Sequence, residues 1–358
     1  MTKTIAYFLP QYHEIPENNK WWGKGFTEWT NLNNAKKLFR NHNFLTPLNN
    51  NQYNLLDVET VEWQTDLMNQ YKIDGLCYYH YWFRGKKLLE KPAENLMKYK
   101  NINQNFMFMW ANHDWTKSWI GKKDLLIKQE YGDKNDWINH INYLISFFKD
   151  ERYIKVDNKP VFQVYIPEDI TDSRMFEIWN KRCKEEGFDG IYLIQNIDNL
   201  NKLKSETFNK TYHSKTIMEH SFSMNYWRER NIFMRGINKV QRILNQNNIN
   251  SISYERLAQT SITLINEMKS YPNINYGIMT GWDNTPRYGK RGYILKNSNP
   301  KNFQNYFEKI YSLSLNHNRN FLFVSCWNEW CEGMCLEPSE QYGYKFLESI
   351  KKTVLKYA

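Results

Sequence analysis

The stretch Phe321-Leu322-Phe323-Val324-Ser325-Cys326-Trp327-Asn328-Glu329-Trp330-Cys331-Glu332-Gly333 places two acidic side chains shortly after an apolar run. The run, residues 321–325, predicts a parallel β-strand that is covered on both faces. Glu329 and Glu332 then stand just beyond the C-terminal end of that strand. In α/β barrels this end of the strands carries the active site.

Comparable apolar runs recur at intervals of about 40 residues, each followed by a polar, helix-like stretch. The predicted strands are residues 5–12, 75–83, 106–110, 160–165, 190–194, 276–279 and 321–325, and an eighth lies between residues 208 and 222, with 216–218 as the best candidate. The predicted helices are residues 57–71, 136–148, 173–186, 254–269, 300–316 and 339–356, with Asp57 and Ser339 as N-caps.

The alternation of strands and helices, without a Gly-rich phosphate loop, favours a barrel over a doubly wound dinucleotide fold. We therefore predict an α/β protein with one (β/α)8 TIM barrel over residues 1–358 and long βα loops. The basic, Asn-rich segment at about residues 223–252 lacks periodicity, and we interpret it as a long loop insertion.

The composition constrains the partners of the chain. Its 48 Lys and Arg against 38 Asp and Glu give a net charge of +10, but the basic residues form no long run. We expect no nucleic-acid partner, while peripheral contact of the basic surface with a membrane is left open, as is the oligomeric state. Aromatic residues make up 16% of the chain, and their faces suit both a core and the apolar face of a sugar ring.

Neither a secretion signal nor a run of about 18 apolar residues is found. We expect a cytoplasmic enzyme, with contact at the inner face of the membrane left open. The cysteines Cys326, Cys331 and Cys335 are clustered but lack the spacing of a zinc knuckle. We expect neither a metal nor a cofactor.

Polar and aromatic side chains follow five of the predicted strands. A single polar residue there is usually only a loop residue, and His80 is as easily explained by hydrogen bonds to backbone groups. Five such strand ends together favour a sugar site, with Trp for stacking and Asn, His and Asp for hydroxyl groups. The candidates are Gln11, Tyr12, His80, Tyr81, Trp110, Asn112, Trp282, Asp283, Asn284, Arg287, Trp327 and Asn328. We expect one cavity to be faced by Gln11, His80, Asn112, Asp283, Glu329 and Glu332.

Glu329 and Glu332 are the candidate catalytic residues. Cleavage of a glycosidic bond needs one group to protonate the leaving oxygen and a second to act as base or nucleophile. Two carboxyls in one pocket repel, so one of them can hold a proton near neutral pH. The alternative is that one of them only pairs with an arginine such as Arg287.

The same residues resemble the hallmark of the WbsX family. The resemblance covers almost the whole chain, through residues 7–13, 25–29, 79–83, 110–112, 281–287, 327–333 and 336–338 and Gly343. It adds Tyr7, Glu28 and Trp29 to the substrate-binding candidates. WbsX-like proteins occur in O-antigen and capsular polysaccharide gene clusters and are often labelled glycosyltransferases.

The WbsX family is similar to glycoside hydrolase family 99, the endo-α-mannosidases, which are (β/α)8 barrels. That similarity implies a retaining mechanism in which Glu329 takes the proton of the sugar 2-hydroxyl. Glu332 would then be the general acid that protonates the leaving oxygen, and afterwards the base that activates water or another acceptor.

Three functions remain open at this point. The first is a retaining glycoside hydrolase or transglycosidase that acts on a bacterial surface polysaccharide, an oligosaccharide or a lipid-linked glycan. The second is a sugar-nucleotide-dependent glycosyltransferase, although neither an Asp-x-Asp motif nor a Gly-rich loop is found in the sequence. The third is a carbohydrate-binding protein without catalysis.

Overall fold

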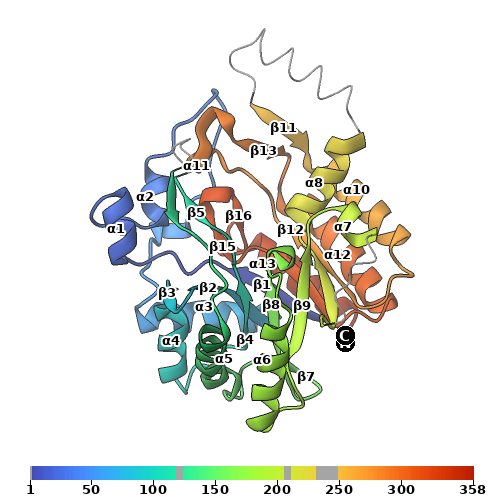
Figure 1. Ribbon diagram of the computed structural model, residues 1–358. Coiled ribbons are helices and arrows are strands. Elements are labelled where there is room, and N and C mark those ends of the chain that lie inside the picture. Colours follow the sequence, from blue (N-terminus) through green and yellow to red (C-terminus); the bar gives the residue numbers. More distant parts are fainter. Residues whose placement is uncertain (1, 118–123, 205–210, 231–248) are drawn as a thin grey trace.

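Eight parallel strands form a closed barrel at the centre of the computed structural model, which describes residues 2–117, 124–204, 211–230 and 249–358 (Figure 1). The ring closes because β1 pairs with both β2 and β14, so that Ile5 lies opposite Gly75 on one side and Phe323 on the other. The predicted (β/α)8 barrel is confirmed. Its strands are β1 (Lys3–Phe8), β2 (Gly75–Phe83), β4 (Phe106–Trp110), β8 (Lys159–Val164), β9 (Tyr192–Ile197), β10 (Ser214–Ile217), β12 (Ile274–Met279) and β14 (Phe321–Ser325).

Helices surround the barrel (Figure 1). The helices that connect one barrel strand to the next, or follow the last strand, are α3 (Val58–Gln70), α4 (Lys91–Lys98), α5 (Lys134–Phe148), α6 (Arg174–Glu185), α7 (Leu200–Lys204), α8 (Glu219–Arg230), α10 (Tyr254–Glu267), α12 (Pro300–Asn316) and α13 (Lys345–Lys356). Three short helices, α1 (Pro16–Trp22), α2 (Glu28–Asn33) and α11 (Thr285–Tyr288), belong to the long loops that follow β1 and β12.

Short strands and 3-10 turns complete these loops. The strands are β3 (Lys86–Leu88), β5 (Trp115–Thr116), β6 (Leu125–Ile127), β7 (Lys155–Val156), β11 (Asn250–Ser253), β13 (Tyr293–Lys296), β15 (Asn328–Glu329) and β16 (Met334–Cys335). The 3-10 turns are Leu48–Asn50, Pro167–Asp169, Gly289–Arg291 and Trp330–Glu332.

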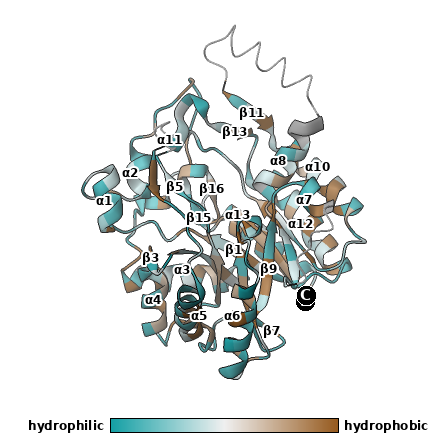
Figure 2. Ribbon diagram, in the orientation of Figure 1, coloured by the Kyte–Doolittle hydropathy of each residue, from teal (hydrophilic) through white to brown (hydrophobic). Residues whose placement is uncertain are grey.

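Apolar side chains fill the space between barrel and helices. Brown, hydrophobic residues occur in both strands and helices in Figure 2. Inside the barrel, the ring of Tyr7 stacks on Phe323 with centroids 5.3 Å apart. The Tyr7 hydroxyl accepts a hydrogen bond of 2.8 Å from Nε2 of Gln163. This buried layer closes the barrel beneath its C-terminal mouth.

Two predicted boundaries are wrong for reasons visible in the hydrogen bonds. The first strand ends at Phe8 rather than at residue 12, because Pro10 has no N–H for a strand ladder and the N–H of Leu9 donates to the side chain of Asn328. The last helix begins at Lys345 rather than at Ser339. Ser339 instead begins a turn, in which the carbonyl of Ser339 accepts a hydrogen bond of 2.7 Å from the N–H of Gly343.

The segment predicted as a loop from residue 223 begins as a helix, since α8 continues to Arg230, and it ends in β11, which pairs in parallel with β13. The apolar residues of α8 are spread around the helix, so the sequence carries no helical periodicity there. The remainder of that predicted loop, residues 231–248, lies outside the described residues.

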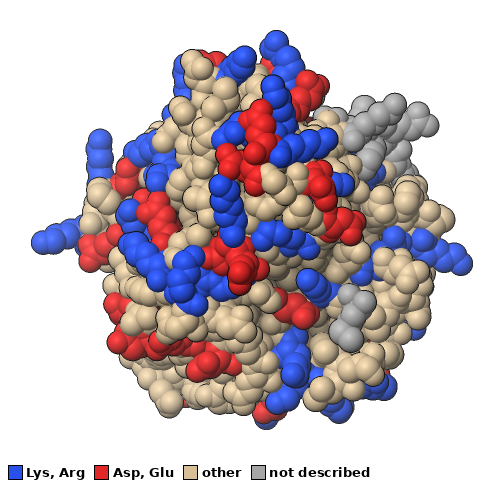
Figure 3. Space-filling model, turned by 90° about the horizontal axis from the view of Figure 1, so that it is seen from below, with Lys and Arg blue, Asp and Glu red and all other residues tan. Residues whose placement is uncertain are grey.

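Charged side chains of both signs are interspersed on the face seen in Figure 3. Ion pairs such as Lys149 with Glu186, at 2.7 Å, join neighbouring helices. Among the described helices, none is long and apolar enough to cross a bilayer.

Candidate active site

A cleft of about 380 Å³ opens at the C-terminal ends of the barrel strands. Five of the predicted site residues line it, namely Gln11, Tyr81, Arg287, Glu329 and Glu332. The remaining lining is mostly aromatic and apolar, with a few polar groups: Leu9, Trp22, Tyr79, Met109, Ala111, His113, Asp114, Trp115, Thr116, Leu126, Tyr165, Met218, Tyr288 and Met334. Such a mixture suits a ligand with both apolar faces and hydroxyl groups.

A tight hairpin brings the two glutamates to the same cleft. β15 pairs antiparallel with β16, and the 3-10 turn Trp330–Glu332 fills the connection. Gly333 ends the turn at φ 60, a left-handed conformation that favours glycine, and a Cβ there would lie 3.1 Å from the backbone nitrogen of Asp283. The sequence Glu-x-x-Glu-Gly is thus the local reason why both carboxyls face the cleft.

Arg287 joins the two candidate catalytic residues. Its Nη1 donates to Oε1 of Glu329 at 3.2 Å and to Oε1 of Glu332 at 2.5 Å. The sum of these two distances, about 5.7 Å, is an upper limit for the separation of the two Oε1 atoms. The other side of the guanidinium pairs with Oε2 of Glu28, at 3.2 Å from Nε and 3.0 Å from Nη2.

The charges in this cluster do not balance, since three carboxyl groups share one guanidinium. The side chain of Glu28 is fully buried and that of Arg287 is only 6% exposed. Burial, followed by the charge of Glu332, raises the pKa of Glu329 to about 8, although Arg287 acts in the opposite direction. These surroundings favour a proton on Glu329 at neutral pH.

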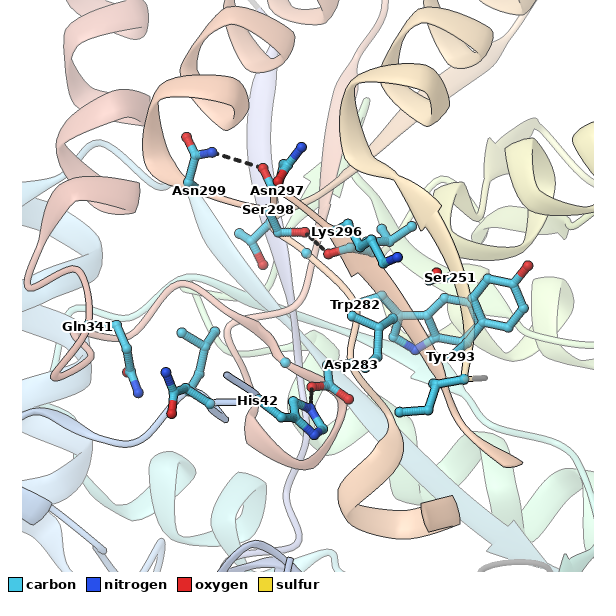
Figure 4. A pocket seen from close by; sticks show the side chains of 18 of the residues that line it. His42, Ser251, Trp282, Asp283, Tyr293, Lys296, Asn297, Ser298, Asn299 and Gln341 are labelled. Atoms are coloured by element: carbon cyan, nitrogen blue, oxygen red, sulfur yellow. Dashed lines mark hydrogen bonds and ion pairs between the residues drawn. The ribbon is translucent and has the colours of Figure 1, made fainter. Parts of the chain in front are cut away.

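Glu332 is held by the loop that follows β12. Oε2 of Glu332 accepts a hydrogen bond of 3.2 Å from the indole N–H of Trp282, and its carbonyl accepts one of 2.7 Å from the N–H of Asp283. Asp283 is fixed in turn by Nε2 of His42 at 2.8 Å and by the hydroxyl of Thr285 at 2.6 Å. Trp282 and Asp283 thus contact the loop that carries Glu332, but they line a neighbouring cavity rather than the cleft (Figure 4).

His80 and Trp110 do not line the cleft. Successive side chains of a strand alternate between its two faces, so Tyr79 and Tyr81 point into the barrel mouth and His80 points outward. Nε2 of His80 lies 2.8 Å from Nε2 of His140 in α5, and burial lowers the pKa of His80 to about 3. The expectation that His80 faces the shared cavity is therefore wrong.

The side chain of Asn112 is also occupied elsewhere. It is fully buried, and its amide donates to the carbonyl of Ile166 at 2.7 Å and to the hydroxyl of Tyr131 at 3.0 Å. Asn112 therefore fixes the loop after β8, and it too does not line the cleft. Asn284 accepts a hydrogen bond of 2.7 Å from the N–H of Tyr293 and so organises the loop after β12.

Several predicted residues support the mouth from beneath. The amide of Asn328 bonds both backbone groups of Leu9 and so joins the ends of β14 and β1. The Tyr12 hydroxyl donates to the carbonyl of Asn328 at 2.5 Å, and the Tyr12 ring packs on Trp29 with centroids 4.4 Å apart. Trp327 is fully buried. These residues, like Tyr7 in the layer below, hold the cleft in shape without lining it.

Some residues of the cleft are not among those predicted from the sequence, including Tyr79, Trp22, Tyr165 and Tyr288. Tyr165 directly ends the predicted fourth strand, so its position already carried the signal. Tyr79 could be assigned to the cleft only if the inward-facing and outward-facing residues of its strand were distinguished. Trp22 and Tyr288 come from short loop helices, for which the periodicity of the sequence gives no signal.

Within the described residues, no group of three or more His, Cys, Asp or Glu side chains is placed to hold a metal ion.

The model of the family described as Glycosyltransferase WbsX matches residues 4–350. The chain belongs to this family. Two curated relatives share sequence with this chain. They are the Uncharacterized protein WxcX of two strains of Xanthomonas campestris pv. campestris, and each is 28% identical to this chain over 366 residues. The match covers 98% of this chain and 49% of WxcX, so the chain spans about half the length of these relatives.

Solved structures with the same fold include glycoside hydrolases. The GH99 endo-α-mannosidase from Bacteroides thetaiotaomicron, in complex with Bis-Tris propane, superposes with a TM-score of 0.61 at 12% identity, covering 99% of this chain and 96% of that one. A protein described as glycoside hydrolase-like superposes with a TM-score of 0.62 at 12% identity, covering 98% and 93%. At these identities the likeness establishes the barrel fold of the WbsX-family chain and leaves its activity to be argued from the site.

Proposed function

We propose that this WbsX-family chain is a retaining glycoside hydrolase or transglycosidase that acts on bacterial surface polysaccharide or its lipid-linked precursor. The family assignment supports a glycan-processing enzyme. The observation that carries the proposal is the shared contact of Glu329 and Glu332 with one nitrogen of Arg287, which limits their Oε1 separation to about 5.7 Å. Retaining glycosidases have carboxyls about 5 to 5.5 Å apart, whereas inverting enzymes need about 6.5 to 9.5 Å for a water molecule.

The first step of the proposed reaction breaks the bond between the anomeric carbon and the leaving oxygen. Glu332 gives its proton to that oxygen, and Glu329 takes the proton of the sugar 2-hydroxyl, whose oxygen closes onto the anomeric carbon. In the second step Glu332 takes a proton from water or an acceptor hydroxyl, whose oxygen attacks the anomeric carbon. The bond between the anomeric carbon and the 2-oxygen breaks, and Glu329 returns its proton to the 2-oxygen. Atoms and charges balance over the two steps, and both carboxyls end as they began.

One proton shared by the pair is enough for this cycle. The raised pKa of Glu329 supports a pair that retains such a proton at neutral pH. The raised pKa of Glu329 favours that proton on Glu329, whereas the acid role assigned to Glu332 by family resemblance requires it on Glu332. The proposal therefore includes a proton shift between the two carboxyls when substrate enters.

The buried amide of Gln11 supports a polar ligand in the cleft. Gln11 is 3% exposed and lines the cleft, and among the described residues its Nε2 has no hydrogen-bond partner. An unsatisfied buried donor costs about 1–3 kcal/mol, which a sugar hydroxyl would recover.

The testing experiment compares glycan cleavage with sugar-nucleotide turnover. Oligosaccharides prepared from the producing bacterium's surface polysaccharide are incubated with the protein and with the Glu329→Gln and Glu332→Gln variants. We expect cleavage or transfer by the wild type and a loss of about 10²–10⁴-fold in each variant, the usual value of general acid–base assistance. Glu151→Gln, an exposed position, is the matched control and keeps wild-type rates. Near-normal turnover by both active-site variants would refute the proposal.

The family's description as a glycosyltransferase favours a second candidate, a sugar-nucleotide-dependent glycosyltransferase. Such an enzyme would take its sugar from a sugar nucleotide, with the nucleotide phosphate as leaving group, and pass it to an acceptor hydroxyl. A sugar-nucleotide donor distinguishes the two functions: consumption of the nucleotide sugar with no cleavage of the glycan would establish the transferase.

A further inference from the structure

A second cavity, of about 950 Å³, lies next to the candidate active site (Figure 4). Gly281, Trp282, Asp283 and Gly333 form part of its wall. Glu332, which Trp282 and Asp283 contact, lines the catalytic cleft. The two cavities are therefore separated by little more than the segment that holds Glu332.

Aromatic rings contribute much of the apolar surface of the second cavity. Trp282 and Tyr293 stack on each other, with centroids 5.8 Å apart and planes inclined by 20° (Figure 4). Phe39, which is 47% exposed, stacks on His42 with centroids 4.5 Å apart. Together these rings offer aromatic faces on which the apolar face of a sugar ring can stack.

Polar side chains from three separate loops surround these rings. The neutral amides and hydroxyls among them include Ser251, Asn297, Ser298, Asn299 and Gln341. Lys296 is the one lysine or arginine that lines the described part of the cavity. Asp283 supplies a carboxylate that already pairs with His42 and Thr285. A phosphate-bearing ligand needs several cationic or helix N-terminal donors, whereas a neutral sugar needs aromatic faces and dispersed hydrogen-bonding groups.

We propose that the second cavity binds a neutral, hydroxyl-rich segment of the glycan, remote from the bond that the cleft cleaves. The proposal rests on the proposed function, because it assigns the two cavities to one extended substrate. Their shared wall supports this: a glycan that enters both would contact Trp282 from one side and Glu332 from the other. The substrate is therefore an oligosaccharide or polysaccharide rather than a glycoside of a single sugar.

The test measures binding separately from turnover. Oligosaccharides of one repeating unit and of several, released by mild acid from the producing bacterium's surface polysaccharide, are titrated calorimetrically into the Glu329→Gln protein, so that cleavage does not interfere. Two changes are made in that background. Lys296→Ala removes an exposed donor of the second cavity, and Ser251→Trp fills part of its volume. Lys309→Ala, an exposed lysine of α12 outside both cavities, is the matched control.

We expect both second-cavity variants to raise the Kd of the longer oligosaccharides, by about fivefold for the loss of one hydrogen bond in Lys296→Ala and by more in Ser251→Trp. The Kd of the shortest oligosaccharide and all values for Lys309→Ala stay unchanged. Equal Kd values for long oligosaccharides in Lys296→Ala, Ser251→Trp and the control would overturn the inference, as would an equal loss for short and long ones.

Failure of the proposed function gives a different result. If the protein with both glutamates intact cleaves and transfers no glycan, but the two variants still lose affinity for long oligosaccharides alone, the second cavity is a glycan site and the catalytic proposal fails. If cleavage occurs and affinity for long oligosaccharides is unaffected, the catalytic proposal stands and the second site is refuted.

Discussion

Replacing Arg287 by methionine should destabilise the protein and do so increasingly as the pH rises. The guanidinium is the countercharge of Glu28, Glu329 and Glu332, and its side chain is 6% exposed. Methionine preserves much of the volume but removes the charge, which leaves three buried carboxyls without a cation. Removal of one partner from a buried ion pair costs about 3–5 kcal/mol.

This free energy translates into a measurable change in melting temperature. The entropy of unfolding is about 2.1 cal/mol/K per residue, or about 0.75 kcal/mol/K for 358 residues, so Tm should fall by about 4–7 °C. Arg291→Met is the matched control, because Arg291 is exposed and close in sequence. It should change the stability by less than about 0.5 kcal/mol.

The pH dependence follows from the direction of the pKa shift of Glu329. Its pKa in the folded protein is raised by burial and by Glu332, to about 8, so between the unfolded pKa and that value the folded state binds more protons than the unfolded state. Stability from this group therefore decreases as the pH rises through that window. Arg287 lowers the pKa of Glu329, so Arg287→Met raises it further and extends the decrease to higher pH.

The assay is a series of thermal denaturation curves at pH 5, 7 and 9 for wild type, Arg287→Met and Arg291→Met. We expect the Tm difference between Arg287→Met and wild type to be smallest at pH 5, where Glu329 is protonated and needs no countercharge, and largest at pH 9. A constant difference across this range, or a variant as stable as Arg291→Met at pH 9, would refute the account of the charge cluster.

Three further outcomes are expected. Glu332→Gln should impair substrates with basic leaving groups most and activated aryl glycosides least, because the latter depart with little protonation; equal losses for both, measured as kcat/KM, would remove the acid role from Glu332. His80→Phe should lower the urea midpoint by the equivalent of about 1–3 kcal/mol, because it leaves His140 without its partner, and should leave kcat unchanged; a large loss of kcat at unaltered stability would return His80 to the active site. Dialysis against a chelator should leave glycan turnover unchanged, whereas a loss that Mn²⁺ or Mg²⁺ restores would favour a metal-dependent transferase.

The barrel could be predicted from the sequence because its strands are almost continuously apolar and are separated by helices with regular spacing. All eight strands were expected at or near their observed positions, including β10, whose Thr216 and Ile217 lie within the best candidate run. The errors occur where the sequence has no regular spacing of apolar residues. The α8 helix lacks an apolar face. At Ser339 the hydroxyl accepts a hydrogen bond from the N–H of Tyr342 in a turn that closes at Gly343, rather than capping a helix.

The candidate site could be predicted only as far as strand ends identify it. Position along a strand places a residue at the barrel mouth, but the face of the strand decides whether it reaches the cleft. Tyr81 and Glu329 reach it, whereas His80 points toward α5. Contacts between distant loops, such as Arg287 with Glu28, depend on tertiary structure, although Arg287 pairing with a glutamate was the alternative considered from sequence.

The stereochemistry of the first product tests the central claim most directly. The claim is that Glu329 and Glu332 act together on one glycosidic bond at a separation too short for an inverting water molecule. Proton NMR of the anomeric signals, recorded within the first turnovers of an oligosaccharide of known linkage, reports the configuration before mutarotation. The account predicts that the newly formed reducing end or transfer product first appears with the configuration of the cleaved bond. First appearance of the opposite anomer would contradict it.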